Sequence, residues 1–228
     1  MRRAVAAFVC CLAMPIWAAA AQTAPTRSEI AIYAGLHEAA AKGDVAEIEK
    51  LVAEGEKLNI QDSKSRTPLH VAVYLKQPAA ARALLKLGAN PNALDIDRYD
   101  VVTIAAVAND LDMLKVVLDG GASAKTITSR YDGTALIAAA HLGHTEAVML
   151  LIAAKAPLNH VNNLGWTALM EAIVLGNGGT NHTATVRALA EAGCDVNVAD
   201  RQGITPLQHA RRRGYVEMAR ILENAGAR

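Results

Sequence analysis

The chain has 228 residues and a formal net charge of +1, and only 4% of its residues are aromatic. Loss of residues 1–21 would remove two of the 23 basic residues and none of the 22 acidic ones, giving a net charge of −1. Charge this close to neutrality argues against a general nucleic-acid-binding protein, which needs many cations to neutralise phosphates. The length suits one or two compact domains.

The start of the chain reads as a secretory signal peptide. Two arginines are followed by a mostly apolar stretch over residues 4–17 and by three alanines that end at Ala21. We expect cleavage after Ala21 and no stable membrane insertion afterwards, since the apolar run is short for a bilayer. An uncleaved anchor is the alternative. Val9 before Cys10 argues against a lipoprotein signal, and residues 22–28 are predicted to be a disordered lead-in.

Cys194 is the one cysteine that follows the leader, so no internal disulfide is expected in the processed chain. It stands where small apolar residues stand elsewhere in the sequence, which favours a buried, inert side chain. A redox or intermolecular role is the alternative.

A fixed period organises the chain after residue 30. Alanines recur at intervals of 33, 33, 34, 33 and 38 residues, at Ala39, Ala72, Ala105, Ala139, Ala172 and Ala210. Such a period indicates a stack of one supersecondary unit, here two short helices.

Helix signals recur in chain order. We expect Ser28 to cap a first helix, Gly43 to end an inner helix and Asp44 to cap the outer helix after it. In the second unit Thr67 is the expected cap, with Pro68 at the first helical position, where no N–H is missed.

The later units depart from this pattern. Asp100 replaces the threonine cap in the third unit, and Asn109 takes the left-handed stop. Lys155 replaces a helix-ending glycine, and positive φ costs a non-glycine residue about 1 kcal/mol, so we expect a reshaped corner there. The long interval reflects a Gly-rich insertion at 176–183 between the inner and outer helices, either a flexible bulge or a lip over a partner.

Thr67-Pro68-Leu69-His70 with Ala72, and Gly88-Ala89 followed by Asn92, resemble an ankyrin repeat. The resemblance covers roughly residues 33–228 and implies an all-α solenoid of helix-turn-helix units with β-hairpin-like turns. The expected repeats span residues 29–61, 62–94, 95–127, 128–161, 162–199 and 200–228.

The resemblance implies binding of a protein partner and no catalytic activity or cofactor. In such stacks two variable residues before each helix stop line a concave face, and here most of them are apolar. Tyrosine, tryptophan and arginine, which are enriched at binding hot spots, stand in the hairpins, and Arg66 precedes a cap. The predicted partner-binding residues are Tyr74, Tyr99, Val107, Tyr131, His141, Leu142, Trp166 and Val174.

A metal site at His141, His144 and His182 is a weaker hypothesis, because no cysteine supports it. The other motif-position histidines, His37 and His70, are expected to hydrogen-bond within turns, as is His144. Arg211–Arg213 reads as a solvated end face, or else as a site for an acidic partner or lipid headgroups.

The resemblance to exported bacterial ankyrin proteins implies a monomeric periplasmic adaptor, and it allows a role in peroxide defence. The alternatives are an enzyme built on a repeat scaffold and a secreted effector directed at host proteins.

Overall fold

The computed structural model describes residues 24–228. The predicted signal peptide at residues 1–21 therefore lies outside the described residues. Within them the chain forms helices and no strand, with one isolated bridge between Thr128 and Gly133. No helix in this part of the chain combines the length and the apolar character needed to cross a bilayer.

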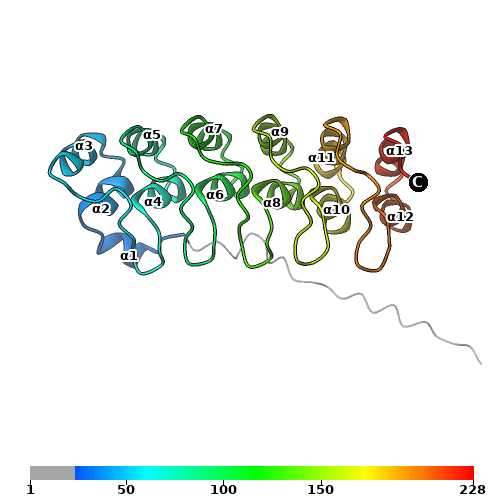
Figure 1. Cartoon of the computed structure of the whole chain (residues 1–228), viewed down its shortest axis with the longest axis horizontal. Coiled ribbons are helices and arrows are strands. Elements are labelled where there is room, and N and C mark those ends of the chain that lie inside the picture. The colour runs from blue at the N-terminus through cyan, green and yellow to red at the C-terminus, as the bar shows by residue number, and fades with distance from the viewer. Residues whose placement is uncertain (1–23) are drawn as a thin grey trace, which may run out of the picture.

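Twelve of the described helices form two parallel rows (Figure 1). The inner row consists of α2 (Gly35–Lys42), α4 (Pro68–Tyr74), α6 (Val101–Val107), α8 (Ala135–Leu142), α10 (Ala168–Val174) and α12 (Pro206–Arg212). The outer row consists of α3 (Val45–Ala53), α5 (Pro78–Lys86), α7 (Leu111–Asp119), α9 (Thr145–Ala153), α11 (Thr180–Glu191) and α13 (Val216–Asn224). Hairpin loops extend from the inner row on the side away from the outer row. The predicted all-α solenoid of six helix pairs is confirmed.

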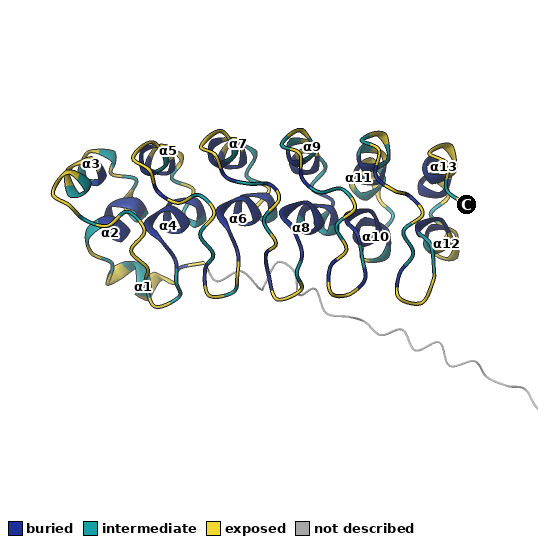
Figure 2. Cartoon of the chain, in the orientation of Figure 1, coloured by how far each residue is buried: buried dark blue, intermediate teal, exposed yellow. Residues whose placement is uncertain are grey.

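The inner helices in the middle of the stack are buried over most of their length (Figure 2). In α4 every residue from Pro68 to Val73 is buried, and in α6 so is every residue from Val101 to Ala106. A helix this short is marginal alone, so its stability comes from the neighbours on both sides. Each fully buried leucine or isoleucine contributes roughly 1.5–3 kcal/mol before conformational entropy is counted.

The helix boundaries follow the predicted signals. The side chains of Asp44, Thr67 and Asp100 each accept a hydrogen bond from a backbone N–H in the first turn. Pro68 is at the start of α4, and Asn109 has a φ of 49°. These expectations are confirmed.

The lead-in and one corner differ from expectation. Residues Arg27–Ala31 form a helix, α1, and its N-cap is Thr26; Ser28, the expected cap, lies inside the helix. Lys155 adopts a φ of 63°, in the left-handed region that the equivalent glycines also occupy, and its corner keeps the backbone hydrogen bonds of the glycine corners. The expected reshaping is therefore wrong. Burial of Ala156 and Leu151 on either side holds the lysine backbone in the left-handed region.

The insertion is only partly a loop. Helix α11 has 12 residues, whereas every other outer helix has nine, so some of the extra residues lengthen the start of the helix. His182 in that added turn lies against Gly176, where a Cβ would come within 2.6 Å of the imidazole and 2.0 Å of the Ala172 carbonyl oxygen. Gly176 therefore allows a close approach that another residue would block.

Candidate functional site

Four of the hairpin loops are each shaped by one polar side chain at the start of the loop, and the hairpin at residues 128–133 differs. Asp62 Oδ1 accepts hydrogen bonds from the backbone N–H groups of Lys64 (2.8 Å) and Arg66 (2.9 Å). The backbone N–H of Asp62 in turn donates to the Arg66 carbonyl oxygen at 3.0 Å. The same arrangement recurs at Asp95, Asn162 and Asp200. In these four loops the residue stands five positions before the helix cap, a regular spacing that is visible in the sequence but was not among the predicted signals.

In the first two hairpins, the second carboxylate oxygen of the aspartate accepts a hydrogen bond from a tyrosine of the preceding repeat. The Tyr33 hydroxyl donates to Asp62 Oδ2 at 2.8 Å, and the Tyr74 hydroxyl donates to Asp95 Oδ2 at 3.0 Å. Burial, the nearby Asp95 carboxylate and the hydrogen bond to it raise the pKa of Tyr74. The hydroxyl of Tyr74 is thus held inside the protein, while the half-buried ring remains at the surface of the inner row.

A third polar cluster joins the fourth and fifth repeats. His141 Nδ1 lies 3.0 Å from Glu171 Oε2, and Asn162 Nδ2 donates to Glu171 Oε1 at 2.9 Å. Glu171 is 4% exposed, so its carboxylate is buried with a partner on each oxygen. This arrangement positions the His141 ring, and it leaves Glu171 without a free face for a ligand.

Histidines and other side chains at the starts of outer helices join consecutive repeats. His144 Nδ1 donates to the Ala106 carbonyl oxygen and His182 Nε2 to that of His141, each at 3.0 Å. The Tyr215 hydroxyl donates to Gly176 in the same way. His37 also bonds across repeats, to Arg66. The expectation of hydrogen bonds within turns is therefore wrong for His37 and His144, which bond to other repeats. His70 bonds Thr67 within its turn, and its Nε2 also donates to the Tyr99 carbonyl oxygen of the next repeat.

The contacts of these histidines also argue against a metal site at His141, His144 and His182. His141, His144 and His182 each use a ring nitrogen for a hydrogen bond to a separate acceptor, and they do not converge on one point. Within residues 24–228 no group of three potential ligands is placed to hold a metal ion.

Burial raises the pKa of the Cys194 thiol to about 11, which disfavours the reactive thiolate at neutral pH.

The ends of the inner helices carry an apolar stripe, which we define by its six side chains. None of the six is fully buried, and Leu175 is 38% exposed. They are Tyr74, Leu75, Val107, Leu142, Val174 and Leu175. Alanines two or three residues earlier on the same helices, such as Ala105 and Ala139, are buried. The six side chains of the stripe therefore lie at the surface of the inner row, where a partner has access to them.

The hairpin residues divide into two groups. Tyr131 is 39% exposed and Trp166 is half-buried, so both remain available at the hairpins. Tyr99 is only 9% exposed and Arg66 is fully buried, so neither presents its side chain to a partner. Like them, the half-buried Trp166 precedes a buried helix cap, so this position does not by itself decide exposure. The local contacts decide it, because Tyr99 packs in the hydrophobic core. Arg66 forms ion pairs with Asp62 and Glu29.

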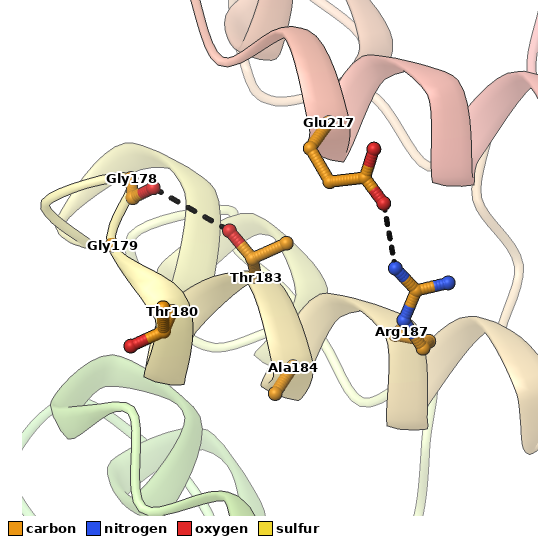
Figure 3. Close-up of a pocket in the computed structure, with 7 residues that line it drawn as sticks. All are labelled: Gly178, Gly179, Thr180, Thr183, Ala184, Arg187 and Glu217. Atoms are coloured by element: carbon orange, nitrogen blue, oxygen red, sulfur yellow. Dashed lines mark hydrogen bonds and ion pairs between the residues drawn. The ribbon is translucent and has the colours of Figure 1, made fainter.

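A shallow hollow separates the starts of α11 and α13 (Figure 3). Figure 3 shows Arg187 and Glu217 facing each other across it, with 2.7 Å between Arg187 Nη2 and Glu217 Oε1. The Thr183 hydroxyl donates to the Gly178 carbonyl oxygen. The charged groups that line the hollow are thus paired with each other, as in a structural contact between two repeats.

The protein has the architecture of a repeat scaffold. Its helix pairs stack in one direction, hairpins join them, and a more polar helix pair closes each end. The family model for ankyrin repeats (3 copies) matches residues 33–95 and 102–200, and that for ankyrin repeats (many copies) matches residues 179–223. The chain belongs to the ankyrin repeat family, whose members are scaffolds for protein–protein interaction.

Individual relatives agree with this assignment. The ankyrin repeat protein YahD of Escherichia coli (strain K12) is 35% identical over 190 residues, which cover 83% of this chain and 94% of YahD. The crystal structure of an ankyrin repeat domain from Acinetobacter baumannii AYE has a TM-score of 0.80 and 46% identity, and the match covers 85% of this chain and 98% of that one. The ankyrin repeat domain of Bcl-3, a member of the IkappaB protein family, has a TM-score of 0.76 and 30% identity, covering 86% and 88%.

Proposed function

We propose that the chain is exported to the periplasm and acts there as a monomeric adaptor that binds another protein through the inner row of helices. The observation that carries the proposal is the apolar stripe, because contiguous apolar surface on a soluble protein usually marks an interaction site. Trp166 and Tyr131 at the neighbouring hairpins are of the residue types most enriched in binding hot spots. The leader sequence supports export.

Substitutions on the stripe test the binding role. Leu142→Asp places a charge at the centre of the stripe, and Trp166→Ala removes an aromatic side chain from the hairpin that precedes α10. We expect both variants to lose at least tenfold in capture of the partner from a periplasmic extract, with the captured protein identified by mass. A charge inside an apolar interface must be desolvated without a counter-ion, which makes binding unfavourable.

The matched control is Met149→Asp, in the same repeat. Met149 is 56% exposed on the outer helix α9, so the same change of charge falls on the opposite layer. Capture of the same protein by Leu142→Asp and by the wild type at equal efficiency would place binding elsewhere. Circular dichroism spectra must show that all variants remain folded.

Export has its own test. The protein recovered from a periplasmic fraction should begin at Gln22, as read by N-terminal sequencing, because cleavage is expected after Ala21. Recovery of the protein with Met1 in the cytoplasmic fraction would contradict the periplasmic assignment and would leave the binding role to be judged by capture alone.

A further inference from the structure

The residues at which the inner helices end carry positive charges and no negative ones. Each inner helix ends in a stop triplet of two residues and a turn residue, and the six triplets are 41–43, 74–76, 107–109, 141–143, 174–176 and 212–214. These triplets contain Lys42, Lys76, Arg212 and Arg213 and no acidic residue. Lys42 is neutralised by Glu38, whose Oε1 lies 2.5 Å from the ammonium nitrogen.

The other three cations are free to meet a partner. Lys76, Arg212 and Arg213 are exposed, and within residues 24–228 none of them forms a salt bridge. Arg211 differs, because its guanidinium is paired with Glu223 at 2.7 Å. The only carboxylate close to the stripe on its own helices is Glu171, which is buried and paired with His141 and Asn162.

The cations stand at the two ends of the apolar stripe. Lys76 follows Tyr74 and Leu75 in the second repeat, and Arg212 and Arg213 occupy in the sixth repeat the positions that Val174 and Leu175 occupy in the fifth. A partner lying along the stripe therefore meets aliphatic side chains in the middle, one cation at one end and a pair of arginines at the other. Adjacent arginines suit carboxylates, which they bind through charge-assisted hydrogen bonds.

We propose that the partner contributes one linear segment with an aliphatic centre and acidic residues at the end that lies on the sixth repeat. This inference rests on the proposed binding role. Apolar burial along the stripe supplies most of the free energy, and the arginine pair decides the orientation of the segment and its approach. Four steps of about 10 Å between neighbouring helices require about 12 residues of extended chain.

A peptide-display selection tests this composition. The full processed chain is presented to a library of random 12-residue peptides, in parallel with the double variant Arg212→Glu/Arg213→Glu. The matched control is Arg82→Glu/Lys86→Glu, which makes the same change of charge at two exposed residues of the outer helix α5. A third variant, Leu142→Asp, reports whether the selected peptides occupy the stripe.

The expected result has three parts. Peptides selected by the wild type are enriched at least threefold in Asp and Glu toward one terminus and in aliphatic residues at the centre. Reversal at Arg212 and Arg213 removes the acidic enrichment, whereas the α5 control keeps it. Binding of individual wild-type-selected peptides, measured by fluorescence anisotropy, weakens at least tenfold in the arginine double variant.

Other results overturn the inference. Selected peptides without acidic enrichment, or no peptide above background, would exclude an acidic linear segment as the occupant. An acidic enrichment that survives the reversal would exclude Arg212 and Arg213 as the residues that bind its carboxylates. The proposed function fails separately, because peptides that bind Leu142→Asp as tightly as the wild type do not use the stripe at all. Loss of binding in Leu142→Asp, with no effect of the arginine reversal, would contradict the acidic linear segment and leave the binding role of the stripe in place.

Discussion

Single buried polar residues decide where the surfaces of this protein lie. Arg66 looks like a hairpin residue available to a partner, yet its guanidinium is buried against Asp62 at 2.7 Å and Glu29 at 2.8 Å. Glu29 comes from α1, a helix 37 residues earlier in the chain. The arginine therefore fastens the first helix of the described chain to the first hairpin and contributes to folding instead of binding.

Replacement of Arg66 by alanine should destabilise the protein strongly. Removal of the buried guanidinium leaves the mostly buried Asp62 carboxylate, and the more exposed Glu29 carboxylate, without their counter-ion. The expected cost, which comes mainly from Asp62, is roughly 3 kcal/mol. Urea denaturation of Arg66→Ala, compared with Arg82→Ala on the exposed face of α5, measures the effect. A loss below about 0.5 kcal/mol, the usual range for an exposed position, would contradict the assignment.

The same cluster predicts a dependence on pH. Hydrogen bonds from Thr26 and the pairing with Arg66 lower the pKa of Glu29. Burial alone would raise the pKa of Asp62, but hydrogen bonds from Tyr33 and Arg66 lower it overall. A lowered pKa in the folded state means stability that is present above the unfolded pKa of about 4 and lost as the pH falls below it. The stability difference between the wild type and Arg66→Ala should therefore shrink between pH 5 and pH 3.

At the scale of the helix and its ends, the repeat tolerates loss of its consensus residues when the physical requirement is still met. Asp100 caps α6 as threonine caps α4, and Asn109 adopts the left-handed stop that glycine adopts after α8. Lys76 and Lys155 do the same with lysine, at φ values of 55° and 63°. In those two places the surrounding core holds a strained backbone.

Relief of that strain gives a testable stability change. Lys155→Gly should raise the free energy of unfolding by roughly 0.5–1 kcal/mol, because glycine adopts positive φ without the steric cost that lysine pays, partly offset by its larger unfolded-state entropy. Lys155→Ala should give no gain, since alanine keeps the Cβ. Thermal and urea unfolding of the three proteins measures this, and equal stability of the glycine and alanine variants would show that the corner is not strained.

At the scale of the whole molecule, each repeat contacts only its neighbours. The position of a destabilising substitution in the stack therefore determines how many repeats it unfolds. Ile48 is the one fully buried residue of α3 in the first repeat, whereas Leu136 in α8 is covered by repeats on both sides. Stability in such a stack is close to a sum of repeat and interface terms.

Two truncations of equal chemistry should therefore unfold different amounts of the chain. Ile48→Ala should remove hydrogen-exchange protection from α2 and α3 while α8 and α9 keep theirs. Leu136→Ala, at a cost of about 2–5 kcal/mol, should lower protection throughout the central repeats. Hydrogen exchange followed by mass spectrometry distinguishes the two patterns, and uniform loss in both variants would show that the stack unfolds as one unit.

The periodic alanines and the cap and stop residues were enough to predict the helix pairs, most of their boundaries and the all-α solenoid, because caps, stops and the spacing of small residues are local patterns in the sequence. The stripe residues Val107, Leu142 and Val174 were also accessible to sequence reasoning, since their positions repeat from unit to unit. The burial of Arg66 and Tyr99 was not, nor was the folding of residues 27–31 onto the first hairpin. Those outcomes depend on partners 29 to 37 residues away, such as Asp62 with Tyr33 and Arg66 with Glu29. Local pattern therefore determined which elements form, and only the stacking of repeats decided which side chains are left for a partner.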